Sequence, residues 1–298
     1  MSEHHHHEIK GKNLFITIIL NIVITVSQIL GGILSGSLAL LSDALHNFSD
    51  VMALIIAWWA NKISLRNKTS DKTYGYKRAQ IVAALFNGAV LVGIGFFLIV
   101  EAISRLQHPE PIGSNLVIYL ALLSIVLNAA SVLLIKDDSH GNLNIKAAYL
   151  HLLTDVMTSI AVLIGGLLMK YYQLFWVDPL VTIIIAIYLI QASYSLITES
   201  VSILMQSTPK SVDLQDIENT VEQIKGLKNI HHIHLWQLDD HQLILEAHLD
   251  FDEDLPISKA TQIESQLVKV LAEKFAITHV TLQAEYNVDD DKGLFCTH

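Results

Sequence analysis

Long uncharged stretches separated by short polar loops fill the N-terminal part of the chain. A helix needs about 20 apolar residues to cross the hydrocarbon core of a bilayer. Uncharged runs of that order cover 79–100, 111–135 and 179–198, and glycines near residue 31 divide another over 13–42. The pattern therefore predicts six transmembrane helices, near residues 12–34, 38–62, 78–104, 114–135, 145–170 and 177–204.

The pattern changes after Pro209. Apolar residues from Leu214 to Ile224 recur at helical spacing, which predicts a short helix. Alternating apolar and polar positions then predict strands over 229–237 and 242–250. A second helix is expected around residues 263–271, and a third strand over 280–286. The order αββαβ is that of a small, ferredoxin-like α+β domain of about 80 residues, which is large enough to fold.

These elements define the fold class and the domain boundaries. We expect an α-helical membrane protein with six transmembrane helices followed by a small α+β cytoplasmic domain. The expected parts are a His-rich N-terminal tail over 1–11, a transmembrane domain over 12–206, the cytoplasmic domain over 207–288 and a C-terminal tail over 289–298.

Lysine and arginine positions predict the orientation. An even number of spans puts both termini on one side, and the loops of that side carry most of the basic residues, whereas the opposite loops carry only Arg105 and Lys170. Short loops rich in lysine and arginine stay in the cytoplasm. We therefore expect cytoplasmic termini and a location in the cell membrane, with the lipid bilayer as solvent.

Composition agrees with two regions in different solvents. Charged residues make up 16% of the chain, against about 25% in soluble proteins. Charges balance up to Gln206, so the formal net charge of -10 falls on the residues that follow. An acidic domain argues against binding nucleic acid, which needs a basic surface, and suits the handling of cations. The single cysteine, Cys296, excludes a disulfide within the chain and favours a reducing compartment.

Two pairs with His-x-x-x-Asp spacing lie inside the expected spans, His46 with Asp50 and His151 with Asp155. A separation of four residues puts both members of a pair on one helix face. The spacing alone is common, but the location is costly, because a charged side chain at the bilayer centre costs roughly 2.5–3.5 kcal/mol. A divalent cation would offset this cost. Two nitrogen and two oxygen donors fit a tetrahedral zinc ion.

The polar residues of the spans can also be interpreted without a metal. The four candidate ligands could pair with one another or with neighbouring helices only for packing, although ionisable groups inside a membrane usually serve function. Asp43, near the outer end of its helix, is expected to be solvated or capping, with a ligand role as the alternative. Glu101 is expected to snorkel toward the outer surface.

Four segments together resemble the cation diffusion facilitator family, specifically its zinc-exporting branch. The stretch SLALLSDALHNFSD over 37–50 resembles the second helix of that family, and YGYKR over 74–78 its cytoplasmic signature before the third helix. The stretch AYLHLLTD over 148–155 is similar to its fifth helix, and Asp178-Pro179 to the start of the sixth. The resemblance runs from about residue 12 to 286.

The resemblance implies a transporter and not an enzyme. Family members are homodimers that exchange cytoplasmic zinc for protons by alternating access, so zinc is cargo and no cofactor is needed. The transport site would consist of His46, Asp50, His151 and Asp155. A histidine at position 46 is linked to a preference for zinc over manganese, in agreement with the softness of imidazole.

The resemblance also implies regulatory zinc in the cytoplasmic domain, held by His234, His248 and Glu285. The match is partial, because some relatives carry histidine where this chain has Gln283. Three further residues are expected to be ordinary surface histidines: His231, His232 and His279. The run His4–His7 is either a metal-collecting segment or a free tail.

Three alternatives stay open at this point. Cadmium, cobalt, iron or nickel could use the same donors. A membrane-embedded zinc enzyme would need an open coordination position, and the His-Glu-x-x-His pattern of metalloproteases is absent from the sequence. A metal sensor or scaffold without transport would be excluded only by a flux measurement.

Overall fold

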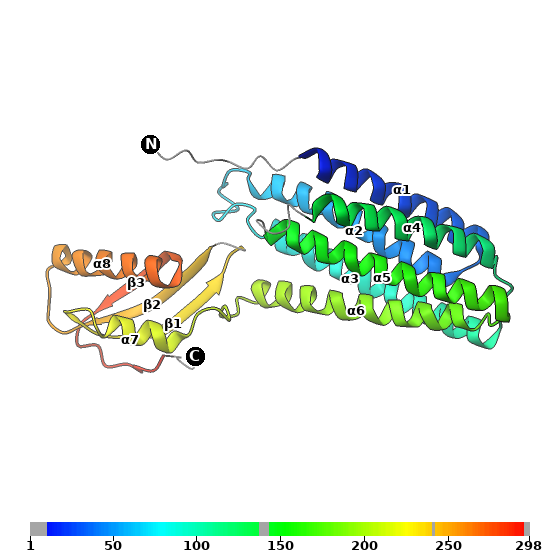
Figure 1. Ribbon diagram of the computed structural model, residues 1–298. Helices are drawn as coiled ribbons and strands as arrows, with labels where there is room; N and C mark the ends of the chain where they lie inside the picture. Colours follow the sequence, from blue (N-terminus) through cyan, green and yellow to red (C-terminus); the bar gives the residue numbers. More distant parts are fainter. Residues whose placement is uncertain (1–10, 137–142, 240–241, 295–298) are drawn as a thin grey trace. The chain divides into compact units, whose positions relative to one another are not determined.

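The computed structural model describes residues 11–136, 143–239 and 242–294 (Figure 1). The tails with His4–His7 and Cys296 lie outside these ranges. Within the described ranges, six helices are long and apolar enough to cross a membrane, as the sequence predicts. Their bounds are Gly11–Ser35 for α1, Leu38–Ser64 for α2, Ala79–Gln107 for α3, Ser114–Ile135 for α4, Leu143–Tyr172 for α5 and Val177–Leu204 for α6.

Large apolar side chains cover the outside of the helices. Leu34, Trp58, Leu133 and Tyr194 are all more than half exposed. Exposed apolar faces of this extent are unusual for a protein dissolved in water and are expected of helices surrounded by lipid. By contrast, the described residues that face inward include many hydroxyl, amide and carboxyl groups, which have to find partners within the helical unit.

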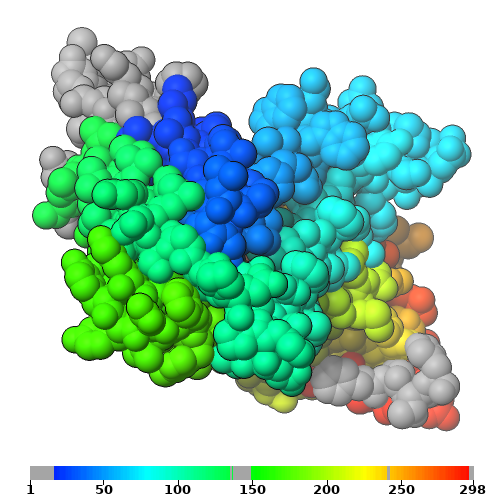
Figure 2. All heavy atoms as spheres, turned by 90° about the vertical axis from the view of Figure 1, so that its right-hand side faces the viewer, coloured from blue at the N-terminus to red at the C-terminus, as the bar shows by residue number. Residues whose placement is uncertain are grey.

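Connections at one end of the helical unit fix where α2 begins. Gly36 adopts a φ of 71°, which glycine tolerates without strain, and so ends α1. Gly113, just before α4, donates its backbone N–H to the carbonyl of Ser35 at 2.8 Å. Figure 2 views this end, where the blue α1–α2 turn lies beside the green segment that joins α3 to α4. Because this turn fixes the start of α2 at Leu38, it also fixes the positions of His46 and Asp50 along the helix.

A carboxylate from α6 caps the start of α2. Asp178 is fully buried and accepts the backbone N–H of Leu38 at 2.8 Å and the hydroxyl of Ser37 at 2.5 Å. The first backbone N–H groups of a helix lack partners within it, and an acidic side chain there also complements the helix dipole. Asp178 therefore anchors the start of α2 to the start of α6.

The cytoplasmic unit contains a three-stranded sheet. Its elements are α7 (Leu214–Val221), β1 (Leu227–Gln237), β2 (Leu243–Phe251), α8 (Ile257–Phe275) and β3 (Ile277–Glu285). The strand order is β1-β2-β3, with β1 antiparallel and β3 parallel to β2. The helix α8 provides the crossover that a parallel pair requires. The αββαβ order expected from the sequence is confirmed.

One face of this sheet packs against the two helices, and the other carries polar side chains. Ile217 of α7, Leu249 of β2 and Leu271 of α8 belong to a single buried cluster. Burial of such side chains contributes about 1.5–3 kcal/mol each. The polar face is therefore available for the histidines and carboxylates of the strands.

Strand β1 is irregular at its centre. His231 pairs with His248 and His234 with Glu246, so three steps along β1 match two along β2. The extra residue is a β-bulge, and His232 there has a φ of 53°. Because the partners on β2 are two residues apart and share a face, the bulge brings His231 and His234 to the same polar face.

Candidate metal centres

The two His-x-x-x-Asp pairs meet between α2 and α5. Nε2 of His46 lies 3.6 Å from Oδ1 of Asp155, and Nδ1 of His46 lies 3.7 Å from Oδ2 of Asp50. Nε2 of His151 lies 3.1 Å from Oδ2 of Asp50 and 3.8 Å from Oδ2 of Asp155. Two pairs of side chains from distant parts of the chain thus converge on one point.

The separations suit a small ion with tetrahedral coordination. Bonds of about 2.0–2.1 Å from zinc to nitrogen or oxygen imply donor atoms roughly 3.3 Å apart. Donor atoms of His46, His151 and Asp155 all lie within 4.8 Å of one another. Asp50 stands outside that group of three but contacts both histidines. With Asp50 included, the four side chains offer two nitrogen and two oxygen donors.

Unpartnered polar atoms also mark this centre. Both ring nitrogens of His46 and both carboxylate oxygens of Asp155 are buried without a hydrogen-bond partner in the described part of the chain. Asp155 is fully buried and His46 is 6% exposed. Leaving one such group unpartnered costs about 1–3 kcal/mol, and more for a charged group. The polar atoms of His46 and Asp155 are therefore close to one another but not hydrogen-bonded.

Asp43 lies at the centre of a separate buried network. It is fully buried, so the expectation of a solvated side chain is wrong. Its carboxylate accepts the hydroxyls of Thr158 at 2.8 Å and Ser159 at 3.1 Å, both from α5, and the amide of Gln28 from α1. Asn47 donates to the same Gln28 at 3.0 Å. These bonds connect α1, α2 and α5 next to the paired ligands.

The outer acidic residue Glu101 also has a partner. Nε of Arg105, one turn along α3, lies 3.4 Å from Oε1 of Glu101, and another nitrogen of Arg105 donates to the carbonyl of Gly36. The side chain of Glu101 is 40% exposed, as that of a snorkelling residue would be. Glu101 therefore pairs with Arg105 near the end of α3 and does not contact the two His-x-x-x-Asp pairs.

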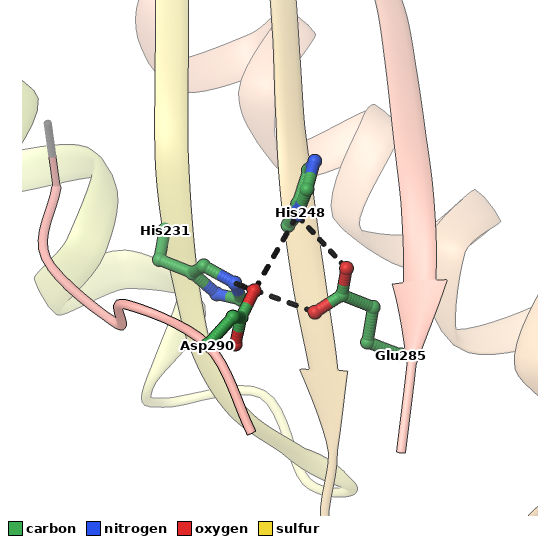
Figure 3. Close-up of side chains that lie close together, drawn as sticks. All are labelled: His231, His248, Glu285 and Asp290. Carbon is green, nitrogen blue, oxygen red and sulfur yellow. Dashed lines mark hydrogen bonds and ion pairs between the residues drawn. The ribbon is translucent and has the colours of Figure 1, made fainter. Parts of the chain in front are cut away.

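A second centre lies on the polar face of the sheet (Figure 3). His231 of β1, His248 of β2, Glu285 of β3 and Asp290 beyond it point toward one another, with donor atoms within 4.8 Å. Nε2 of His231 lies 3.4 Å from Glu285 and 3.3 Å from Asp290. Nδ1 of His248 lies 2.8 Å from Oε1 of Glu285, although not in hydrogen-bond geometry.

The bulge explains why the sequence pattern did not place His231 here. Regular alternation would put it opposite His232 and His234, and its expected position is the surface. It is in fact fully buried, so that expectation is wrong. His234 is exposed and lies against His232, with ring centroids 5.1 Å apart. His279, expected at the surface, is exposed.

A sequence signal for the bulge does exist. Ile230, Ile233 and Leu235 are all buried in the same cluster. Spacings of three and then two residues cannot keep three apolar side chains on one face of a regular strand. An interpretation that required all three to be buried would have placed an extra residue between Ile230 and Ile233.

A lysine shares the second centre with the carboxylates. Lys292 approaches Asp290, Asp250 and Glu285. Partial desolvation of its ammonium group opposes charging, but hydrogen bonds to these three carboxylates outweigh it and raise the pKa of Lys292. The bond from Lys292 in turn lowers the pKa of Asp290. Three carboxylates thus face a single ammonium group at this centre.

Comparison with known proteins identifies related chains. Residues 14–205 match the family described as "Cation efflux transmembrane domain", and residues 209–287 match "Cation efflux protein, cytoplasmic domain", under the name ZT_dimer. A "Cadmium, cobalt and zinc/H(+)-K(+) antiporter" of Bacillus subtilis is 35% identical, covering 98% of this chain and 95% of its own length.

Two further relatives cover nearly the whole chain. The "Metal cation efflux system protein CzcD" of Cupriavidus metallidurans is 32% identical over 96% of this chain and 90% of its own length. The "Zinc transporter ZitB" of Pectobacterium atrosepticum is 30% identical over 98% of this chain and 91% of its own length. The similarity in each case extends over both the helical and the cytoplasmic part.

Proposed function

Because the chain belongs to the cation efflux family of membrane transporters, we propose that it exports zinc from the cytoplasm in exchange for protons. It is a transporter and not an enzyme. The transport site in this proposal consists of His46, Asp50, His151 and Asp155, with zinc as the cargo. The relatives named for zinc transport support zinc as the substrate.

The observation that carries the proposal is the set of unpartnered donors at the first centre. His46 and Asp155 are buried, ionisable and without hydrogen bonds in the described part of the chain. Two imidazole and two carboxylate groups suit zinc better than manganese, which favours oxygen ligands. A bound divalent cation would neutralise both carboxylates and supply the missing interactions.

Unequal exposure of the donors supports access from one side. The side chains of Asp50 and His151 are 25% and 39% exposed, whereas those of His46 and Asp155 are 8% and 0% exposed. Asp50 follows His46 on α2, and His151 precedes Asp155 on the antiparallel α5. The exposed pair therefore lies toward the side of the loops rich in lysine and arginine, which is the cytoplasmic side. We assign this arrangement to the inward-facing state of an alternating-access cycle.

Competition for the same groups gives a route to proton exchange. Histidine and carboxylate ligands must lose their protons before they bind a metal, so metal and protons exclude each other. A site that opens to a more acidic exterior would take up protons and release zinc. The protonated site would then return to the cytoplasmic side, where zinc displaces the protons.

The cytoplasmic centre is proposed as a regulatory zinc site. His231, His248, Glu285 and Asp290 provide two nitrogen and two oxygen donors, again a set that suits zinc. The ligand role expected for His234 stays a prediction, with His234 as an additional ligand on the same sheet face. The match to a dimer domain supports a homodimer, and we place both termini in the cytoplasm and the protein in the cell membrane.

Cadmium and cobalt are the alternative cargoes that an observation favours, because the relative from Bacillus subtilis is named for both ions as well as for zinc. Imidazole and carboxylate donors accept these ions as well. Their transport would leave the fold and the site unchanged and would alter only the selectivity.

The proposal is tested by metal uptake into proteoliposomes with an acidic interior. Parent protein should accumulate zinc, while Asp50→Ala and Asp155→Ala should each lose at least about nine tenths of the initial rate, by analogy with the roughly 10–100-fold cost of disturbing even a supporting group of a metal site. Asp71→Ala is the matched control, because Asp71 is exposed in a loop, where it accepts a hydrogen bond from Ser70. Unchanged uptake in both site variants would refute the four-residue site.

A further inference from the structure

The second centre holds a cation of its own, the ammonium group of Lys292. Its Nζ lies 3.4 Å from Nε2 of His231, 3.3 Å from Oε2 of Glu285 and 3.0 Å from Oδ2 of Asp250, and it pairs with Asp290. Three of these four residues also belong to the group of potential metal ligands. The ammonium group thus lies among the atoms that a metal ion would have to bind.

The backbone around Lys292 is held in place by strand β1. The carbonyl of Gly293 accepts the N–H of His232 at 3.2 Å, and that of Leu294 accepts the N–H of Ile233 at 2.9 Å. These two donors belong to the bulge of β1, where pairing with β2 is interrupted. Leu294 also packs against the buried apolar cluster. The hydrogen bonds and the packing of Leu294 therefore fix the position of Lys292 at the centre.

Electrostatics makes occupation by lysine and by a metal ion mutually exclusive. A divalent ion bound by Glu285 and Asp290 would lie within a few ångströms of Nζ if the lysine stayed. Two like charges at such a separation repel each other strongly near a protein surface, and the double charge of the metal ion increases the repulsion. Nζ also contacts the carboxylates of Glu285 and Asp290, which belong to the group of potential metal ligands.

We propose that Lys292 is a tethered competitor that occupies the cytoplasmic zinc site until zinc displaces it. The inference rests on the proposed regulatory zinc site and adds the residue that sets the zinc concentration at which this site fills. When only a small fraction of the sites is free of the lysine, the apparent affinity for zinc is reduced by that fraction. The site then responds only when cytoplasmic zinc rises above the level that an uncompeted site would detect.

Zinc binding to the full-length protein in detergent tests the competition. The background variant Asp155→Ala removes a transport ligand, so binding at the cytoplasmic centre is measured apart from transport. In this background, Lys292→Gln should bind zinc about tenfold more tightly, since several partly exposed ion pairs together are worth roughly one such factor. Lys292→Arg, which keeps the charge, and Lys269→Gln, which removes an exposed charge on α8, should bind like the parent.

The melting temperature separates competition from a merely structural role. Lys292→Gln should lower the melting temperature of the metal-free protein, because carboxylates are left clustered without a cation. It should leave the zinc-saturated protein unchanged, because the ammonium group has by then been displaced. Equal losses in both forms, or zinc affinity that is unchanged or weaker in Lys292→Gln, would overturn the proposal.

The variant His248→Ala in the same background tests whether the measured zinc binding takes place at the cytoplasmic centre. The tight zinc binding should disappear in this variant. If it persists, the cytoplasmic zinc site is wrong, and the inference about Lys292 fails with it. That result would not bear on zinc export, because the transport proposal is tested separately by uptake into proteoliposomes.

Discussion

Asp155 and His46 illustrate how single side chains define the proposed transport site. Their polar atoms are buried and unpartnered within the described chain, whereas the neighbouring Asp43 has three donors. All three residues were possible metal ligands on the evidence of the sequence, because they lie within the expected spans. Their surroundings, which the sequence does not contain, separate the residues that are available to a metal from the one that is already satisfied.

Exchange of the softer ligand should change the metal preference. In His46→Asp the site would have one nitrogen and three oxygen donors, a set that moves toward manganese. We expect the ratio of zinc to manganese uptake to fall about tenfold in proteoliposomes that are supplied with both ions, because a soft donor is lost. His279→Asp, at an exposed position of β3, should retain the parent ratio. A retained ratio in His46→Asp would show that selectivity is set elsewhere.

Removal of Asp43 should cost stability more than metal binding. Asp43→Ala leaves the hydroxyls of Thr158 and Ser159 and the amide of Gln28 without this acceptor. A buried donor left unsatisfied costs about 1–3 kcal/mol. The melting temperature in detergent should therefore fall by several degrees while the number of zinc ions bound per chain is retained. Loss of a bound zinc ion at an unchanged melting temperature would instead make Asp43 a ligand.

Among the elements, helices are easier to predict than the details of strands. Uncharged runs locate the six spans to within a few residues, because the bilayer imposes their length. The third strand begins at Ile277, three residues before its expected start, because polar His279 and Thr281 weaken the apolar signal there. A histidine at position 232 gives no sign of the positive φ of the bulge, which is usually a position for glycine, and the signal lies only in the spacing of the buried Ile230, Ile233 and Leu235.

The cap at the start of α2 should contribute measurably to the stability of the helical unit. Asp178→Ala removes the acceptor of the Leu38 N–H and the Ser37 hydroxyl. Loss of a helix cap costs about 0.5–2 kcal/mol, and here the buried hydroxyl adds to it. The melting temperature should fall, and Asp178→Asn, which keeps an acceptor oxygen, should recover part of the loss. No difference between Asp178→Ala and the parent would contradict the capping role.

In the molecule as a whole, an acidic cytoplasmic domain accompanies a helical unit without net charge. The sequence alone predicts this division, since the charge of -10 falls after residue 206. What the sequence leaves open is which histidines meet across the strands, since that depends on register. The matched dimer domain implies that two cytoplasmic centres are present in each assembled transporter.

Zinc should stabilise the folded protein as a whole. A ligand that binds only the folded state adds about 2.7 kcal/mol at a free concentration about a hundred times its dissociation constant. We expect the melting temperature of the full chain to rise by several degrees with zinc and to return on addition of a chelator. In a variant that combines Asp155→Ala with His248→Ala, zinc should have no such effect. Persistent stabilisation there would reveal another zinc site.

The proposed function of the whole molecule is the exchange of zinc for protons through His46, Asp50, His151 and Asp155. Zinc entry and internal pH can be recorded together in proteoliposomes after zinc is added outside. We predict that zinc enters and the interior becomes more alkaline as protons leave, and that Asp155→Ala abolishes both signals. Zinc entry without a change in pH, or equal entry in Asp155→Ala, would contradict exchange at this site.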